Sequence, residues 1–463
     1  MAGLIIAKFG GSLLRGGEGY RVLADEVARL RSKNYRVVVV VSAMKGVTDL
    51  LYKAAEPGES VEPILKDVLE RYTMAAREAI DNQEVLARLL GEINTMFSEL
   101  FKLVWAVHVI GEAAPHVKAM IISYGEMLSA ALASGVLRSR GIDSVWLHGG
   151  KAGLVASQGN YMEGIINYRE SSRRVPERLQ PLLEKGVVPV VMGFTAYTPT
   201  GQTVLLGRGG SDYTATLLAR FLSADMARLY TDVDGIYTSD PRRIPSARHI
   251  PELGLGEAIE LALLGAKRMH PRTFEPVEGT GLTVSITMPG SERETLVREG
   301  TPPPPVKAVV VLEGQSVVTV SGGGLAERVG IMARISSIAA RNRINLKAIL
   351  QPPTETVIAL VVNREAAPLL ARSLEAELSR LGVDVDYEHA SLINVVGHGV
   401  SKPEISAEIF RLAAREGGVL GNLSTPGSNT VSLLVEPPEA WRLAERIHEE
   451  VVMEWWRRSE RQS

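Results

Sequence analysis

Leu4-Ile-Ile-Ala-Lys-Phe-Gly-Gly-Ser12 leads from a strand-like run into a glycine turn close to the start of the chain. An amphipathic stretch from Tyr20 to Arg31 follows the turn and predicts a helix. A second buried strand is predicted from Arg36 to Val41, and it ends at Ser42. Strand, helix and strand in this order are typical of a parallel sheet that is covered by helices.

The same alternation continues along the first 300 residues. Further strands are predicted at Ser144 to Leu147, Val187 to Met192 and Met226 to Thr231, with helical patterns between them. Residues from about 61 to 115 look helical throughout, which indicates a helical insertion beside the sheet. We therefore expect residues 1–300 to form one sheet-centred αβα domain.

A proline-rich segment, Gly300-Thr-Pro-Pro-Pro-Pro-Val306, predicts a domain boundary, because proline continues neither a helix nor a central strand. We expect residues 301–306 to be the linker. Two similar strand-like stretches follow, Ser316 to Gly324 and Leu392 to Val400, and each precedes a helical pattern. This internal similarity predicts two small βαββαβ domains, at 307–385 and 386–463.

Composition excludes several classes of function. The 463 residues fit about three domains. With 51 basic and 53 acidic residues the net charge is -2, so there is no overall attraction to nucleic acid or anionic lipid. The chain has no cysteine, which excludes disulfides, thiolate nucleophiles and thiolate metal sites and favours a cytoplasmic location. From hydropathy we expect neither a signal peptide nor a transmembrane helix.

Two glycine-rich turns are candidates for a phosphate site. Gly10 and Gly11 follow Lys8, and Gly207-Arg-Gly-Gly-Ser-Asp212 precedes an apolar helical run. Glycine lets backbone N–H groups approach phosphate oxygens, and a lysine supplies positive charge. Each motif alone also fits a simple turn, or a helix capped by Ser211 or Asp212. Together they favour one polyanion bound at the carboxyl edge of the sheet.

Two charged residues are candidates for holding a small substrate. Ser123-Tyr-Gly-Glu126 fits either a helix capping box or a site where Glu126 accepts a substrate ammonium. Arg208 has the planar fork that suits a carboxylate, although an arginine between glycines is also a common surface residue.

The segment from Tyr230 to Arg242 turns repeatedly after a predicted strand. Calcium is rejected, because Pro241 stands where an EF-hand loop needs glutamate. The segment fits a nucleotide loop, with Tyr237 beside the base or ribose and Arg242 near phosphate, or an ordinary surface loop. Lys267 is either a further phosphate contact or a surface lysine. The eight histidines show no metal-binding spacing, so no protein-bound metal site is predicted.

Taken in order, six motifs resemble those of the aspartate kinases, a group within the amino-acid kinase superfamily. They are Lys8-Phe-Gly-Gly-Ser12, Val41-Ser-Ala-Met-Lys-Gly-Val-Thr48, Ser123-Tyr-Gly-Glu126, Gly207-Arg-Gly-Gly-Ser-Asp212, Thr231-Asp-Val-Asp-Gly-Ile-Tyr-Thr-Ser-Asp-Pro-Arg242 and Gly265-Ala-Lys-Arg-Met-His-Pro271. The resemblance implies ATP-dependent phosphorylation of the aspartate side chain, the first step toward lysine, threonine and methionine. It also implies that the duplicated C-terminal modules are paired ACT domains.

The resemblance assigns roles position by position. Lys8 and Asp212 match the catalytic residues. The positions that match substrate-binding residues are Ser42, Thr48, Glu126, Phe194, Arg208 and Ser211. Those that match ATP-binding residues, besides Lys8, are Gly10, Gly11, Thr231, Asp232, Tyr237, Arg242 and Lys267. Mg²⁺ is expected to be carried mainly by ATP.

The nucleophile itself explains why the sequence shows no candidate general base. An aspartate carboxylate, whose pKa is ordinarily about 3.9, is already ionised at neutral pH. Because an anion then attacks a polyanion, the reaction needs alignment and charge screening instead.

The ACT-like modules imply feedback control by an amino acid and a homodimer or higher homo-oligomer. Effector positions match Gly330, Ile331 and Met332 at a helix start, and Asn345 and Leu346 on the next strand. Lys347 departs from lysine-inhibited relatives, which carry an acidic residue there, so threonine is favoured over lysine as the effector. Ser424-Thr-Pro-Gly departs from the relatives, which often have Ser-Glu after Ser-Thr, and this leaves ligand binding by the second module open.

Two alternatives stay open. One is an amino-acid kinase that acts on another carboxylate substrate; Glu126 and Arg208 favour an α-amino acid, and the C-terminal modules favour aspartate. The other is an amino-acid sensor without transfer chemistry, against which Lys8 and Asp212 speak.

Overall fold

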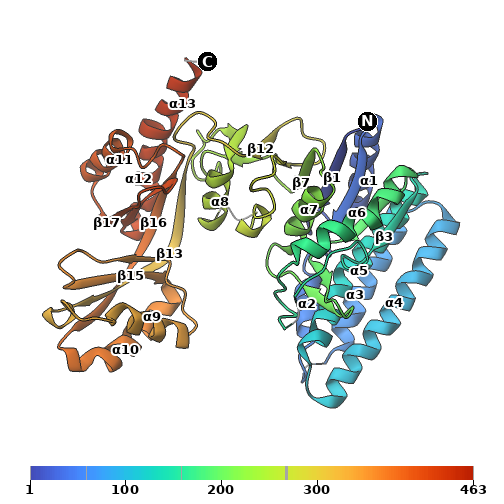
Figure 1. Ribbon diagram of the computed structural model, residues 1–463, viewed down its shortest axis with the longest axis horizontal. Helices are drawn as coiled ribbons and strands as arrows, with labels where there is room; N and C mark the ends of the chain where they lie inside the picture. The colour runs from blue at the N-terminus through green and yellow to red at the C-terminus, as the bar shows by residue number, and fades with distance from the viewer. Residues whose placement is uncertain (1, 59, 158, 266–268, 462–463) are drawn as a thin grey trace. The chain divides into compact units, whose positions relative to one another are not determined.

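The structure is a computed structural model that describes residues 2–58, 60–157, 159–265 and 269–461. The chain divides into two compact units. The first takes in residues up to 236, residues 249–262 and the described part of 267–300, and the second takes in 237–248, the described part of 263–266 and the chain from 301 onward. Figure 1 labels the main helices and strands of both units.

An eight-stranded sheet forms the centre of the first unit, in the order β10-β12-β11-β7-β1-β2-β4-β3. Its neighbours pair parallel, except that β11 and β12 pair antiparallel. The strands are β1 (Leu4–Phe9), β2 (Arg36–Val41), β3 (Ser144–Leu147), β4 (Val188–Met192), β7 (Met226–Tyr230), β10 (Glu252–Gly254), β11 (Thr283–Thr287) and β12 (Glu294–Arg298). All six residues of β1 are buried, as expected of a strand with neighbours on both sides and helices on both faces.

Helices cover this sheet (Figure 1). The helices are α1 (Gly17–Ser32), α2 (Val47–Ala54), α3 (Glu62–Ala79), α4 (Gln83–Ile110), α5 (Pro115–Ser139), α6 (Tyr168–Glu184), α7 (Gly210–Phe221), α8 (Leu255–Leu263) and the short η1 (Pro271–Thr273). The small strands are β5 (Thr195–Tyr197), β6 (Thr203–Leu205), β8 (Ile236–Tyr237) and β9 (His249–Ile250). The α/β class predicted from the sequence is confirmed.

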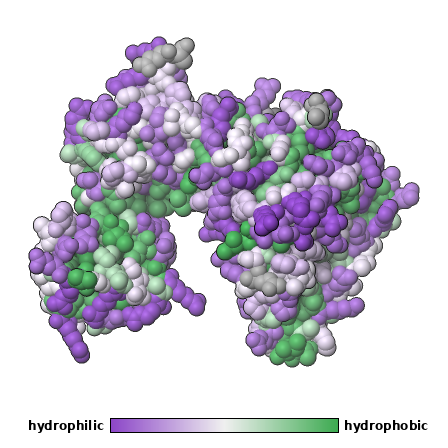
Figure 2. Space-filling view, in the orientation of Figure 1, coloured by the Kyte–Doolittle hydropathy of each residue, from purple (hydrophilic) through white to green (hydrophobic). Residues whose placement is uncertain are grey.

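Within the described residues, two helices are long and apolar enough to cross a membrane by length and composition, α4 and α5. The apolar window of α5 is 89% buried in the structure, so α5 is a core helix. The corresponding window of α4 is 28% buried. Along α4 the side chains of Phe101, Trp105, Val109 and Ile110 are exposed. Figure 2 shows hydrophobic surface at the lower end of this unit, where α4 ends.

The second unit is built on a six-stranded antiparallel sheet, whose strand order is β14-β15-β13-β16-β18-β17. Its strands are β13 (Ala308–Ser321), β14 (Ala348–Leu350), β15 (Val357–Asn363), β16 (Asp384–Val396), β17 (Val419–Ser424) and β18 (Thr430–Val435). Its helices are α9 (Ile331–Arg341), α10 (Ala367–Leu378), α11 (Pro403–Glu416), α12 (Ala440–Ile447) and α13 (Met453–Glu460), with short turns of helix at 323–325, 364–366, 379–381, 437–439 and 448–452.

The order strand, helix, two strands, helix occurs twice in this unit, from β13 to α10 and from β16 to α12. The long strands β13 and β16 pair with each other and join both copies into one sheet. Because β16 begins at Asp384, it crosses the predicted boundary at 385. The division into two domains stays a prediction.

One expectation about this unit is wrong. Gly330 stands at the N-cap of α9, as expected for the segment with Ile331 and Met332. Asn345 and Leu346, however, lie before β14, which begins at Ala348. They do not lie on a strand, because ladder pairing starts with Ala348 opposite Val361.

Candidate active site

The carboxyl ends of four neighbouring strands meet at one edge of the first sheet. Phe9 at the end of β1 is level with Val41 of β2 on one side and with Tyr230 of β7 on the other. Val41 is in turn level with Met192 of β4. The turns that follow these strands therefore lie together, which is where open α/β sheets bind ligands.

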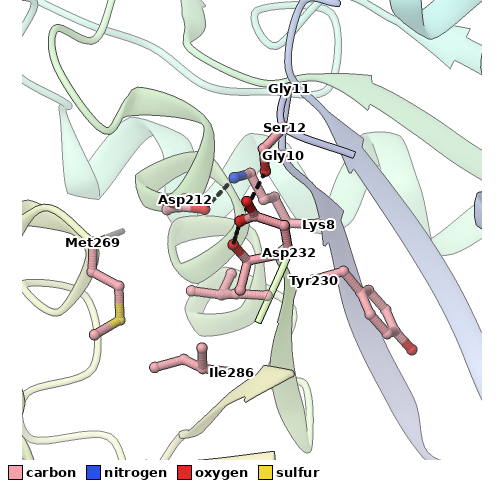
Figure 3. Close-up of a pocket in the computed structure, with 11 residues that line it drawn as sticks. Lys8, Gly10, Gly11, Ser12, Asp212, Tyr230, Asp232, Met269 and Ile286 are labelled. Carbon is pink, nitrogen blue, oxygen red and sulfur yellow. Dashed lines mark hydrogen bonds and ion pairs between the residues drawn. The ribbon is translucent and has the colours of Figure 1, made fainter. Parts of the chain in front are cut away.

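A cavity of about 370 Å³ opens at this edge (Figure 3). Both predicted glycine turns reach it, one through Gly10 and Gly11 and the other through Asp212 at the start of α7. The residues that line the cavity are Lys8, Gly10, Gly11, Ser12, Asp212, Leu229, Tyr230, Thr231, Asp232, Met269 and Ile286. The structure thus brings together six of the predicted site residues.

Lys8 and Asp212 form an ion pair in the cavity. Figure 3 shows their side chains pointing toward one another, and Lys8 Nζ lies 2.6 Å from Asp212 Oδ1. The two side chains are only 11% and 14% exposed. An ammonium group has three donors, so pairing with one carboxylate oxygen still allows it to donate to a phosphate oxygen. The carboxylate therefore orients the ammonium without using up its capacity to bind an anion.

The two glycines of the first turn have different surroundings. A Cβ atom at Gly10 would lie 3.2 Å from Lys8 Nζ, so glycine leaves room for the ammonium. A Cβ atom at Gly11 would lie 2.8 Å from the carbonyl oxygen of Ala43, so glycine lets the turn approach the loop after β2. Even before a ligand is considered, packing demands glycine at position 11.

Asp232 connects the ends of β7 and β1. Its Oδ1 atom accepts hydrogen bonds from Ser12 Oγ at 3.4 Å and from Thr231 Oγ1 at 3.1 Å (Figure 3). Ser12 is a site residue that the motifs leave without a role, although it belongs to the first glycine motif. Its place directly after Gly-Gly is the signal in the sequence that points to it.

The second glycine turn leads directly into α7. Gly207 and Gly209 both have φ of 73°, a backbone conformation that favours glycine. Gly209 is the N-cap, with no side-chain cap, so the alternative that Ser211 or Asp212 caps the helix is wrong. Asp212 faces Lys8 instead, because it lies in the first turn of the helix.

Phe194 adopts a strained backbone, with φ of 67°, which is unusual for a bulky residue. Its backbone N–H donates to Thr214 Oγ1 at 3.1 Å, and a Cβ atom at Gly210 would lie 2.6 Å from its ring. A Cβ atom at Gly193, the preceding residue, would lie 2.6 Å from that of Ser211. The turn after β4 is therefore packed tightly onto the start of α7.

Glu126 lies in the interior of α5, which runs from Pro115 to Ser139, so the capping-box alternative is wrong. It is 3% exposed, and its Oε1 accepts the backbone N–H of Ala43 at 3.1 Å. Its Oε2 is buried and has no hydrogen-bond partner among the described residues. Burial raises the pKa of this carboxyl to about 8. A buried acid with an unpaired oxygen suits a cationic ligand group.

The profile of the Amino acid kinase family matches residues 3–288 of the chain. The chain belongs to this family. It is 30% identical to lysine-sensitive aspartokinase 3 of Escherichia coli K12 over 476 residues, which cover 97% of this chain and 99% of the relative. The bifunctional aspartokinase/homoserine dehydrogenase of Haemophilus influenzae is 30% identical over 89% of this chain, but the chain spans only 52% of that protein.

Solved structures of aspartokinases resemble this chain, in agreement with the sequence relatives. The structure of E. coli aspartokinase III in complex with lysine and aspartate (T-state) has a TM-score of 0.84 at 27% identity and covers 97% of this chain and 99% of its own. The complex of the same enzyme with aspartate and ADP (R-state) has a TM-score of 0.78 at 28% identity. The match covers 97% of this chain and 100% of the chain in that structure. The resemblance to aspartate kinases drawn from the motifs is confirmed.

Other predicted residues of this amino acid kinase lie outside the cavity lining. Ser42 follows β2, where its N–H donates to the carbonyl of Phe9 at 3.2 Å, and Thr48 lies in the first turn of α2. The Ser42 side chain is half-buried, and that of Thr48 is also only partly exposed. Arg208 is exposed in the second glycine turn.

The residues predicted to bind the nucleotide do not all belong to the same unit. Thr231 and Asp232 line the cavity, but Tyr237 and Arg242 belong to the second unit. There Arg242 pairs with both carboxylate oxygens of Asp240, at 3.0 and 2.7 Å, and its side chain is 80% exposed. This pairing lowers the pKa of Asp240. Lys267 falls outside the described residues.

Proposed function

We propose that this amino acid kinase is an aspartate kinase, which transfers the γ-phosphoryl group of ATP to the side-chain carboxylate of L-aspartate and yields 4-phospho-L-aspartate. The observation that carries the proposal is the Lys8–Asp212 pair in the cavity at the carboxyl edge of the sheet. The aspartokinase relatives that match nearly the whole chain supply the substrate class.

In the proposed reaction a carboxylate oxygen of aspartate attacks the γ-phosphorus, and the bond from that phosphorus to the β–γ bridging oxygen breaks as ADP leaves. No proton has to be removed, because the carboxylate is ionised at neutral pH. The residues therefore act by position and charge. Lys8 screens the negative charge on the transferred group, the backbone at Gly10 and Gly11 faces the phosphates, and the N-terminus of α7 adds a positive partial charge.

Asp212 supports this arrangement from the other side. Its carboxylate holds the Lys8 ammonium at 2.6 Å and keeps it extended into the cavity. We assign Asp212 the organising role and Lys8 the direct contact with the phosphoryl group.

Aspartate is proposed to bind between the loop after β2 and the start of α7. Glu126 would receive its ammonium, since its unpaired Oε2 is buried beside Ala43. Arg208 would receive the α-carboxylate as a bidentate pair. The remaining contacts are assigned to Ser42, Thr48, Phe194 and Ser211.

For the nucleotide we propose contacts from Lys8, Gly10, Gly11, Thr231 and Asp232. The assignment of Tyr237, Arg242 and Lys267 as further ATP residues rests on the resemblance of the motifs alone. Mg²⁺ is proposed to arrive with the phosphates. Among the described residues no group of three or more acidic or histidine side chains is placed to hold a metal ion by itself. The two carboxylates on the cavity wall, Asp212 and Asp232, suit a cation that is already bound to phosphate oxygens.

One assay tests the proposal. Incubation with MgATP, hydroxylamine and a candidate acid traps an acyl phosphate as its hydroxamate. Aspartyl hydroxamate, without glutamyl or acetylglutamyl hydroxamate, is the expected product. Another hydroxamate would change the substrate, and ligand binding without any ATP turnover would support a sensor.

We also propose that an amino acid regulates the enzyme through its C-terminal modules. The E. coli relative is lysine-sensitive and was solved with lysine. In this chain Lys347, near the proposed effector positions Gly330, Ile331, Met332, Asn345 and Leu346, would repel a lysine side chain, so threonine is the proposed effector. Inhibition by lysine but not by threonine would contradict this assignment. A homodimer or higher oligomer and a cytoplasmic location complete the proposal.

A further inference from the structure

Tyr72 of α3 carries a hydroxyl group that reaches from the helical insertion to the substrate side of the sheet. The side chain is fully buried. Its hydroxyl donates to the carbonyl oxygen of Gly125 in α5 at 2.8 Å. The Tyr72 hydroxyl oxygen also accepts a hydrogen bond from the backbone N–H of Met44, in the loop after β2, at 3.1 Å. One side chain thus holds two backbone segments that come from different parts of the sequence.

The proton positions in this network follow from its geometry. A carbonyl oxygen only accepts, so the single hydroxyl proton of Tyr72 goes to Gly125. Ser129 Oγ, 3.2 Å away, must then donate to Tyr72. Tyr20, whose hydroxyl lies 2.8 Å from Ser129 Oγ, must in turn donate to Ser129. The donor and both acceptor sites of Tyr72 are therefore all used.

The two segments that Tyr72 holds are those that place Glu126. Met44 follows Ala43, whose N–H donates to Glu126 Oε1 at 3.1 Å, and Gly125 precedes Glu126. A Cβ atom at Gly125 would lie 2.8 Å from the Cβ of Ala43, so helix and loop already touch. The Tyr72 hydroxyl adds hydrogen bonds to both segments, one to the loop at Met44 and one to the helix at Gly125.

We infer that Tyr72 is a positioning residue for the aspartate subsite: by joining Met44 to Gly125 it fixes the distance between the loop after β2 and the Glu126 carboxylate. This inference rests on the proposed aspartate kinase activity. The hydrogen bonds of the Tyr72 hydroxyl go to Met44, Gly125 and Ser129, so it acts on aspartate through the backbone that carries Glu126. The helical insertion thereby gains a role in substrate binding.

The role predicts a selective effect. Loss of the hydroxyl leaves the buried Met44 N–H without its acceptor and lets the loop move relative to α5. Ammonium binding by Glu126 depends on that distance. The ion pair of Lys8 and Asp212 joins β1 to α7, so it does not depend on the distance between the loop after β2 and the Glu126 carboxylate.

Tyr72→Phe in the full chain is the first test, with steady-state kinetics for each substrate in turn. We expect the KM for aspartate to rise at least tenfold, with the KM for ATP and kcat within about threefold of wild type. Tyr124→Phe is the matched control, since this buried tyrosine lies two residues from Glu126 but its hydroxyl donates to Glu99 in α4, at 3.4 Å. The control should leave both KM values unchanged.

An unchanged aspartate KM in folded Tyr72→Phe, or an equal rise in the KM of both substrates, overturns the inference. If Tyr72→Phe fails to fold, Ser129→Ala takes its place, because it removes one donor to Tyr72 and leaves the aromatic packing intact. A smaller rise confined to the aspartate KM is then expected, and no rise overturns the inference. Wild-type enzyme that forms no aspartyl hydroxamate contradicts the proposed function instead, so the two failures are distinguishable.

Discussion

Lys8 Nζ lies 2.6 Å from Asp212 Oδ1, in a cavity where both side chains are largely shielded from water. The two residues come from the end of the central strand and from the first turn of α7. Their pairing places one positive charge, held in a fixed direction, beside the glycine turn that faces the proposed phosphates. An enzyme that joins two anions needs such a charge more than it needs a base.

Lys8→Ala should lower kcat by about 10²–10³-fold, a typical cost of removing one preorganised charge donor. The far-ultraviolet circular dichroism spectrum should stay that of wild type. Lys53→Ala, which removes an exposed lysine from α2, is the control and should retain full turnover. Near-wild-type kcat in Lys8→Ala would reject the catalytic assignment.

Glu126→Gln should raise the KM for aspartate at least tenfold, because the neutral amide cannot pair with the substrate ammonium. The KM for ATP should stay close to that of wild type. Steady-state kinetics with each substrate varied separately provide the measurement. A proportional rise in both KM values would mean that Glu126 acts on the fold rather than on aspartate.

The same carboxyl predicts a pH dependence of stability. Its folded pKa of about 8 lies above the unfolded value of about 4.3, so the ligand-free native state binds the extra proton. The contribution of Glu126 to stability is therefore present at low pH and is lost as pH rises from about 4.3 through about 8. Urea unfolding should show that wild type loses stability relative to Glu126→Gln over this range, and parallel pH curves would contradict the prediction.

Aspartate binding should release protons at neutral pH. The substrate ammonium stabilises the ionised form of Glu126 and so lowers its pKa. Titration calorimetry at about pH 7 in two buffers with different ionisation enthalpies should give up to about one proton released per aspartate bound. Buffer-independent enthalpies would show that Glu126 does not receive the ammonium.

Gly11→Ala should impair binding of both substrates, because the new Cβ would lie 2.8 Å from the carbonyl oxygen of Ala43 and displace the loop after β2. We expect a destabilisation of about 1–3 kcal/mol by urea unfolding. Gly91→Ala is the control, since a Cβ there meets no atom within 4 Å and lies inside α4. It should be neutral or stabilising by up to about 1 kcal/mol.

Much of the sheet edge at which the cavity opens is predictable from local patterns. The run Leu4 to Phe9 is a strand because its residues are almost all apolar and a Gly-Gly turn ends it. Lys8 and Asp212 can be placed together because parallel strands present their carboxyl ends on one side of the sheet. The strand pairing of Phe9 with Val41 and Tyr230 follows the same principle.

Other features depend on tertiary contacts and carry no local signal. The spacing of Ser123 and Glu126 is that of a capping box, but it also occurs inside helices, and α5 has already begun at Pro115. Tyr72 lies in a helix without any recognisable motif, so its bonds to Met44 and Gly125 cannot be read from the sequence. Tyr237 and Arg242 are matched by motif alone, which does not report the unit to which a segment belongs.

A crystal structure of the full chain with L-aspartate, Mg²⁺ and a non-hydrolysable ATP analogue would show whether the Lys8–Asp212 pair binds the transferred phosphoryl group. We expect Lys8 Nζ to lie within hydrogen-bond distance of a γ-phosphate oxygen, with the aspartate ammonium on Glu126 and its side-chain carboxylate facing the γ-phosphorus. A triphosphate bound away from the Lys8–Asp212 pair would contradict this expectation.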